Sequence, residues 1–171
     1  MMNWPEGTAS TDALLVMALV ISGPLHFALE CWDDSIHWKA GLERKEHLVH
    51  GLLASLAFCI ALSANSLGFS PGCIPVFLLL IILAVVLEEV VGIHDRCALK
   101  TERVLHSTIF LNGTFLAMAL FHVTVNPELA SVSLVVLVCR LLLVGAALRL
   151  VGVIACALKP CHPRKHAPSR V

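Results

Sequence analysis

The sequence predicts an all-α membrane protein, a single helical bundle of about five transmembrane helices. Of its 171 residues, 58% are hydrophobic and 14% carry a charged side chain, against about 25% charged residues in a typical soluble domain. Apolar runs near the roughly 20 residues that a helix needs to cross a bilayer recur five times along the chain. Most of the protein surface is therefore expected to face lipid rather than water.

The five predicted spans are residues 13–31, 47–66, 73–93, 105–125 and 130–158. Two short connectors rich in Gly and Pro alternate with two longer, charged connectors: 67–72 and 126–129 are short, and 32–46 and 94–104 are charged. The segment before the first span has acidic residues but no Lys or Arg, so it lacks the positive region of a secretory signal. We expect a polar N-terminal segment (1–12), one transmembrane domain (13–158) and a basic tail (159–171).

The basic residues of the predicted connectors and tail are confined to one side of the membrane. That side holds Lys39, Arg44, Lys45, Arg96, Lys100, Arg103, Lys159, Arg164, Lys165 and Arg170. Positively charged loops mark the cytoplasmic side, so a multi-pass topology with the N-terminus outside and the C-terminus in the cytoplasm is predicted. The 12 basic and 12 acidic residues cancel, which excludes the basic footprint of a nucleic-acid-binding protein.

A repeat relates the second and fourth spans. Residues 44–53 (RKEHLVHGLL) and 100–109 (KTERVLHSTI) align without a gap, so 100 minus 44 gives an offset of 56. The alignment matches Glu46 to Glu102 and His50 to His106. We interpret the first four spans as a duplicated helical hairpin, as in other internally repeated membrane folds.

Ionisable residues near the cytoplasmic ends of these spans are the candidate functional site. Charged groups within a bilayer are costly and usually mark function. The candidate ligands, which share a similar depth, are His26, Glu30, Glu46, His50, Glu88, Glu89, Glu102 and His106. Three i,i+4 pairs, each on one helical face, are present among them: His26 with Glu30, Glu46 with His50, and Glu102 with His106.

The order of these ligands indicates a dinuclear metal site. The four spans supply Glu, Glu with His, Glu, and Glu with His, as in ferritin-like four-helix carboxylate proteins, although Glu-x-x-x-His replaces their Glu-x-x-His. Mixed nitrogen and oxygen ligands suit iron, manganese or zinc, and iron is the expected metal. A b-type haem between His50 and His106 is less favoured, because an axial pair does not require nearby carboxylates.

The predicted function is an oxidase, hydroxylase or desaturase acting on a lipid or quinone. The residues leave two other classes open: a metal-free lipid-modifying enzyme in which His26 and Glu30 act as acid and base, and a non-enzymatic proton carrier, metal carrier or structural membrane protein. Arg149, near mid-membrane in the fifth span, is expected to pair with Glu88 or Glu89. The seven scattered cysteines are expected to be reduced thiols.

The pattern of Glu and His also resembles a known family. The stretch from Glu88 through His94 and Glu102 to His106, with His37 and Trp38 ahead of the second span, is similar to the transmembrane protein 45 family. The resemblance covers about a third of the chain. It implies a polytopic membrane protein and no particular reaction.

Overall fold

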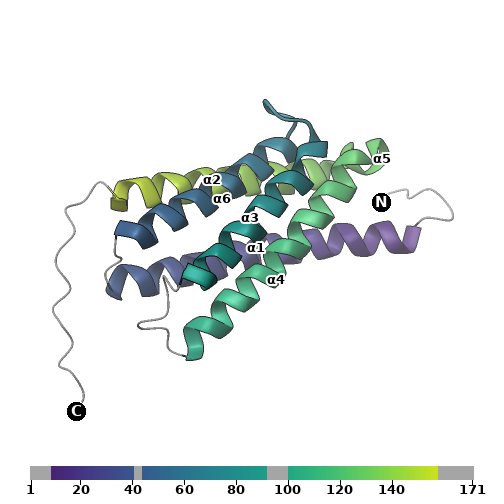
Figure 1. Cartoon of the computed structure of the whole chain (residues 1–171). Coiled ribbons are helices and arrows are strands. Elements are labelled where there is room, and N and C mark those ends of the chain that lie inside the picture. Colours follow the sequence, from purple (N-terminus) through teal and green to yellow (C-terminus); the bar gives the residue numbers. More distant parts are fainter. Residues whose placement is uncertain (1–8, 41–43, 92–99, 158–171) are drawn as a thin grey trace, which may run out of the picture.

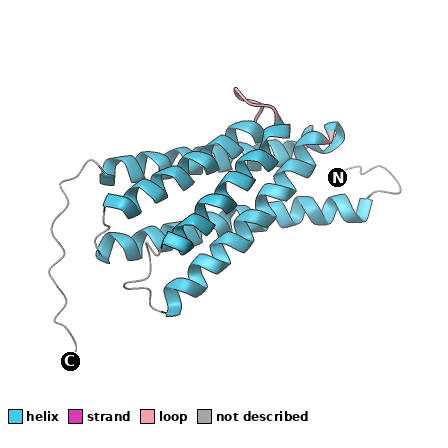
Figure 2. Ribbon diagram, in the orientation of Figure 1, coloured by secondary structure: helices cyan, strands magenta, loops and turns pink. Residues whose placement is uncertain are grey.

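In the computed structural model, every element of regular secondary structure in the described ranges is a helix, and these ranges contain no strand (Figure 2). The structure describes the backbone of residues 9–40, 44–91 and 100–157, and the side-chain surroundings of residues 12–36, 48–86 and 104–155. The prediction of an all-α fold is therefore confirmed for this part of the chain.

Five longer helices and two short ones follow one another along the described chain. They are α1 (Ala9–Ala40), α2 (Arg44–Ala64), η1 (Pro71–Cys73), α3 (Ile74–Val91), α4 (Lys100–Val125), α5 (Pro127–Ala130) and α6 (Ser133–Ala157). Helix α1 packs on α4, α2 packs on α6, and α3 contacts both α2 and α4. Successive long helices run in opposite directions, so α1 begins and α6 ends at opposite ends of an elongated bundle (Figure 1).

Helix α1 extends well beyond the predicted first span. The sequence predicts a charged connector from residue 32, but the helix has 32 residues and continues to Ala40. Residues 32–40 contain no Gly or Pro that would end it. The side chain of Asp33 also lies inside the bundle, with 3% of the residue exposed, so part of the predicted connector belongs to the interior.

The two short connectors form turns, as their Gly and Pro content predicts. Ser66 and Gly68 adopt positive φ angles of 54° and 81°, a conformation that Gly reaches without a steric cost. Before α5, the Asn126 side chain accepts a hydrogen bond from the Glu128 backbone N–H at 3.1 Å, which caps the helix in the usual way for Asn. The first turn places α2 beside α3, and after the second turn α5 contacts both α4 and α6.

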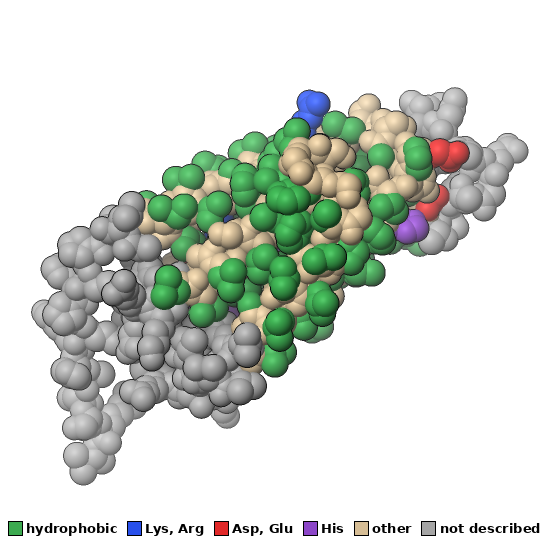
Figure 3. All heavy atoms as spheres, turned by 45° about the horizontal axis from the view of Figure 1, so that its top comes forward, with side chains coloured by type: hydrophobic (Ala, Val, Ile, Leu, Met, Phe, Trp, Pro, Cys, Tyr) green, Lys and Arg blue, Asp and Glu red, His purple; other side chains and the backbone are tan. Residues whose placement is uncertain are grey.

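Within the described residues, three helices are long and apolar enough to cross a membrane. Their apolar parts are Asp12–Ile36 in α1, Val104–Val125 in α4 and Ser133–Ala155 in α6. The apolar stretches Leu48–Ala64 and Pro71–Val86 are shorter. Large hydrophobic side chains are exposed on all five longer helices, and the face drawn in Figure 3 is largely hydrophobic, with charged side chains at its rim. The structure thus supports a membrane protein with at least these three helices of spanning length.

The closest packing lies near the end of the bundle where α1 begins. Leu19, Ile74, Val123 and Val135 are almost fully buried there, at 2% exposure or less, and they come from four different helices. Hydrogen bonds between helices add to the apolar contacts. The Asn112 amide, in α4, donates to the carbonyl oxygen of Ser22 in α1 at 3.0 Å, so this polar side chain links the two helices.

Candidate functional site

Ionisable side chains collect at the other end of the bundle, in one layer. Asp33 lies three residues before the end of the apolar part of α1 at Ile36, and Arg149 lies six before its end in α6 at Ala155. His50 and His106 each lie two residues inside the start of the apolar parts of α2 and α4. At 1.5 Å per residue these positions are about 3 to 9 Å below the ends of the apolar segments.

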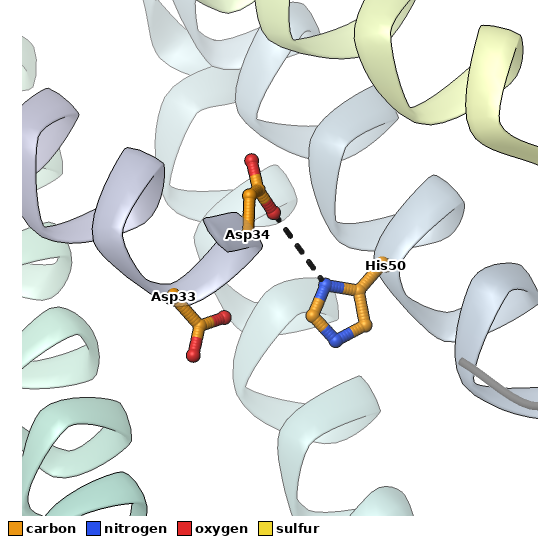
Figure 4. A group of neighbouring side chains, drawn as sticks. All are labelled: Asp33, Asp34 and His50. Carbon is orange, nitrogen blue, oxygen red and sulfur yellow. Dashed lines mark ion pairs between the residues drawn. The ribbon is translucent and has the colours of Figure 1, made fainter. Parts of the chain in front are cut away.

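Asp33, Asp34 and His50 form the tightest group of metal-ligand side chains among the described residues. One ligand atom from each lies within 4.8 Å of the other two. His50 Nδ1 and Asp34 Oδ1 are 4.0 Å apart, and the His50 side chain is 7% exposed. Figure 4 shows the Asp34 carboxylate directed from α1 toward the His50 ring on α2.

His106 approaches the same pair of aspartates from a different helix. Its Nε2 lies 2.8 Å from Asp33 Oδ1, and the Asp33 side chain is 5% exposed. Because a carboxylate accepts hydrogen bonds, the ring N–H of His106 is the donor when Asp33 is ionised. Neighbouring residues on a helix point about 100° apart, so Asp33 reaches α4 while Asp34 reaches α2.

Arg149 connects this group to the second half of the polar layer. Its guanidinium forms a salt bridge with Glu30, and its Nε lies 3.4 Å from Asp34 Oδ2. Glu30 Oε1 in turn lies 3.5 Å from Nε2 of His26, one turn earlier in α1. A continuous series of ionisable side chains thus extends from His26 through Arg149 to the aspartates.

Arg149 pairs with carboxylates of α1, whereas the sequence predicts Glu88 or Glu89 of α3 as its partner. The side chains of Glu88 and Glu89 lie outside the described residues. Among the described residues, α6 contacts α1 and α2, and the extended α1 brings Glu30 and Asp34 to the guanidinium. Arg149 thus has the carboxylate partners that its position requires, but they come from α1 and not from α3.

Negative charge exceeds fixed positive charge in this layer. The described part holds three carboxylates, on Glu30, Asp33 and Asp34, and one guanidinium, on Arg149. Buried charges without compensation are strongly unfavourable. Among the described residues, protonated histidines, protonated carboxyl groups or a bound cation can offset this excess of negative charge.

A cavity of about 680 Å³ lies between the five longer helices and reaches this layer. Most of its lining is aliphatic, but Asp33, His50, His106 and Arg149 form one end. A mostly apolar cavity with a few convergent polar groups is typical of a small-molecule site, for which volumes of about 300–1,000 Å³ are usual. The geometry therefore combines a candidate metal site with space for an apolar ligand.

The structure brings together half of the ligands that the sequence predicts. His26, Glu30, His50 and His106 all line the cavity. The predicted ligands whose side chains lie outside the described residues are Glu46, Glu88, Glu89 and Glu102. Their place in the site, and with it the complete dinuclear ligand set, stays a prediction.

Asp33 and Asp34 are the site residues that sequence reasoning missed. The sequence predicts a connector at these positions, because the apolar run ends near residue 31. A usable signal was present, since Glu30, Asp33 and Asp34 follow one another at the i,i+3 and i,i+4 spacing of one helical face. Extending the helix past the end of the apolar run would have placed them beside Glu30.

The chain matches no protein-family model, no curated protein and no solved structure. The resemblance to the transmembrane protein 45 family therefore stays a prediction, and the function must be argued from the site itself.

Proposed function

We propose that this protein is a membrane-embedded metal protein with a centre built on Asp33, Asp34 and His50. The observation that carries the proposal is the approach of these three side chains to within 4.8 Å of one another at the polar end of an otherwise apolar cavity. Divalent cations take carboxylate oxygens and imidazole nitrogens as ligands, so such an ion would bind where these three side chains converge. It would also explain why the Asp33 carboxylate is buried at the end of the apolar part of α1.

The spacing of the ligand atoms suits a metal of the first transition series. Nitrogen and oxygen ligands bind such ions at about 2.0–2.2 Å, so two ligands of one ion lie at most about 4.4 Å apart. The His50 to Asp34 distance of 4.0 Å is within that limit. The three ligand atoms lie within 4.8 Å of one another, a few tenths of an ångström more than the limit of about 4.4 Å for two ligands of one ion. A small side-chain rotation closes this difference.

The proposal extends to a second ion and to the reaction. Asp33 is shared between the His50 group and His106, and a carboxylate in that position can bridge two ions, as in four-helix carboxylate proteins. Glu46, Glu88 or Glu89, and Glu102 are proposed to complete the set. We propose iron as the metal and a lipid or quinone as the substrate of an oxidase, hydroxylase or desaturase, because oxygen chemistry requires a redox metal or other cofactor.

Five membrane spans form part of the same proposal. Helices α2 and α3 pack on each other, and their neighbours include the long helices α4 and α6. The apolar part of α2, Leu48–Ala64, has 17 residues, near the lower limit of about 17 for a spanning helix. With all five crossing, the polar layer lies on the side that the Lys and Arg distribution assigns to the cytoplasm.

Elemental analysis of the full chain, purified in mild detergent, tests the metal site. We expect iron in the unaltered protein and at least a fivefold lower content in Asp33→Asn, since loss of a ligand typically costs metal affinity tenfold or more. Asp12→Asn is the matched control, because Asp12 lies near His122, 3.9 Å away, at the opposite end of the bundle. Equal metal in Asp33→Asn and Asp12→Asn would exclude the site. Zinc without iron would keep the site and exclude the oxidase.

One observation favours a second candidate, a carrier for protons or metal ions. The series from His26 through Glu30 and Arg149 to Asp34 is continuous, and such series of ionisable groups are used for transfer within membranes. A proton carrier would change the fluorescence of a pH-sensitive dye in proteoliposomes without any added substrate.

If the protein is instead a metal-free enzyme with His26 and Glu30 as acid and base, a chelator should leave its activity unchanged.

A further inference from the structure

The two oxygens of the Asp34 carboxylate have different partners. Oδ1 lies 4.0 Å from Nδ1 of His50, on the side of the candidate metal site. Oδ2 accepts a hydrogen bond from Nε of Arg149, at 3.4 Å. Figure 4 shows the same division, with one oxygen directed toward the His50 ring and the other directed away from it. One oxygen of Asp34 therefore faces the site, and the other faces Arg149 on α6.

The Arg149 guanidinium is held in place by a second carboxylate. It forms a salt bridge with Glu30, and both side chains are 12% exposed. Glu30 in turn lies near His26, with 3.5 Å between Oε1 and Nε2. The donors of a guanidinium lie in one rigid plane, so the salt bridge with Glu30 also restricts the direction of the Nε–H bond. Arg149 therefore reaches Asp34 with a defined geometry.

Helices α1 and α6 approach each other closely one turn away from this contact. Gly145 precedes Arg149 by four residues, and Phe27 precedes Glu30 by three, so each pair shares one face of its helix. A Cβ atom at Gly145 would lie 3.2 Å from Cδ2 of Phe27. Small residues allow membrane helices to approach in this way. The packing of α6 on α1 therefore brings the guanidinium within reach of both carboxylates.

The direction of the Asp34 carboxylate depends on such a contact more than that of Asp33 does. The Asp34 side chain is 36% exposed, whereas that of Asp33 is 5% exposed, so packing restrains Asp34 less. A carboxylate can bind a metal ion through one oxygen or through both. Hydrogen bonds from outside the ligand set orient ligating carboxylates, and those from a charged donor are the stronger ones. The contact with Arg149 can therefore keep Oδ2 away from an ion beside His50.

We propose that Arg149 is a positioning residue, which makes Asp34 bind the metal ion through Oδ1 alone. The guanidinium does not bind the ion, because both are cations, and it acts through the carboxylate. A ligand that uses one oxygen leaves room on the ion for a water molecule or a substrate, as catalytic metal sites require. This inference rests on the proposed metal centre and adds to it a residue of α6 that controls how the ion is coordinated.

The visible spectrum of bound Co²⁺ tests the inference in the full chain, purified in mild detergent and freed of metal with a chelator. Co²⁺ binds the same nitrogen and oxygen ligands as other ions of its series, and its visible absorption weakens as the number of its ligands rises. The test variant combines Arg149→Leu with Glu30→Gln, since removing both charges leaves no uncompensated ion. We expect this double variant to bind Co²⁺ with about twofold weaker absorption, because both oxygens of Asp34 can then bind.

Two further variants separate positioning from a general disturbance of the bundle. Arg149→Lys retains a charged donor that can reach Asp34, so it should keep the Co²⁺ spectrum of the unaltered chain. Arg140→Leu, at an exposed position of the same helix, should do the same. An unchanged spectrum in the double variant, or weaker absorption in Arg149→Lys or Arg140→Leu as well, would overturn the inference and leave the metal centre in place. Failure of the unaltered chain to bind Co²⁺ would overturn the proposed metal centre, and this inference with it.

Discussion

His106 and Asp33 are 73 positions apart in the chain, yet Nε2 of the histidine lies 2.8 Å from Oδ1 of the aspartate. His50, which the repeat matches to His106, lies beside the neighbouring residue Asp34. Helices α2 and α4 also begin at Arg44 and Lys100, the matched positions of the repeat. The two equivalent histidines therefore approach two consecutive acids of one helix, which fits a site shared between two related hairpins.

Single replacements of these histidines should have similar effects on metal content. If Asp33 bridges two ions, we expect two iron atoms per unaltered chain, about one after His50→Ala or His106→Ala, and almost none after Asp33→Asn. Elemental analysis against protein concentration measures this ratio. If the unaltered chain instead holds one ion, and this ion is lost in His50→Ala but kept in His106→Ala, the metal centre consists of Asp33, Asp34 and His50 alone.

Removal of the metal should lower the thermal stability of the protein. A ligand that binds the folded state alone stabilises it by about 2.7 kcal/mol at 100 times its Kd, so a chelator should lower Tm by several degrees. Asp33→Asn should melt at the same temperature with and without chelator, because it holds no metal. A chelator-induced shift of equal size in Asp33→Asn would show that the metal binds elsewhere.

Arg149→Leu should destabilise the protein strongly, and Glu30→Gln should restore much of the loss. Breaking a buried ion pair by removing one partner costs about 3–5 kcal/mol, whereas removing both charges leaves no uncompensated ion. Both side chains of the Arg149 and Glu30 pair are 12% exposed, so the environment is one in which this rule applies. Thermal melting of the single and double variants in detergent measures the coupling.

Arg140→Leu provides the control for that experiment. Arg140 lies in the same helix but is exposed, so its replacement should change Tm little. The sequence predicts Glu88 or Glu89 as the partner of Arg149. Rescue of Arg149→Leu by Glu88→Gln or Glu89→Gln, without rescue by Glu30→Gln, would restore that expectation and contradict the pairing with α1.

The sequence alone was sufficient for the all-helical fold, and it pointed to four of the ionisable residues that line the cavity. Composition and the length of the apolar runs predict a helical membrane bundle, because these properties depend on the bilayer and not on tertiary contacts. His26, Glu30, His50 and His106 were found for the same reason: an ionisable residue within an apolar run is conspicuous. The structure places all four around one cavity.

The end of α1 and the partner of Arg149 were not predictable in the same way. Hydropathy shows where an apolar segment ends, but it does not show where a helix ends. The polar helical turns that carry Asp33 and Asp34 are therefore predicted as a connector. The partner of Arg149 depends on which helices are neighbours in the bundle. That arrangement is set by tertiary packing, such as the contact between α1 and α6, which no local pattern encodes.

Close contact between α1 and α6 should depend on Gly145. A Cβ atom there would lie 3.2 Å from Cδ2 of Phe27, and small residues allow membrane helices to approach in this way. Gly145→Val should therefore destabilise the bundle by about 1–3 kcal/mol, the usual cost of overpacking, with a lower Tm in detergent. Gly152→Ala, where a Cβ atom has open space, should not lower Tm. An unchanged Tm in Gly145→Val would mean that the two helices are not in close contact.

The orientation of the chain follows from charge and from the number of spans together. With the two ends of the described bundle opposite each other (Figure 1) and the connector Lys and Arg confined to one side, we expect the N-terminus outside and the C-terminus in the cytoplasm. A tag at the C-terminus should be digested by protease in inside-out vesicles and protected in right-side-out vesicles, and a tag at the N-terminus should behave in the opposite way. Two tags accessible from the same side would require an even number of crossings. In that case only one of α2 and α3, whose apolar parts are shorter, would cross the membrane together with α1, α4 and α6.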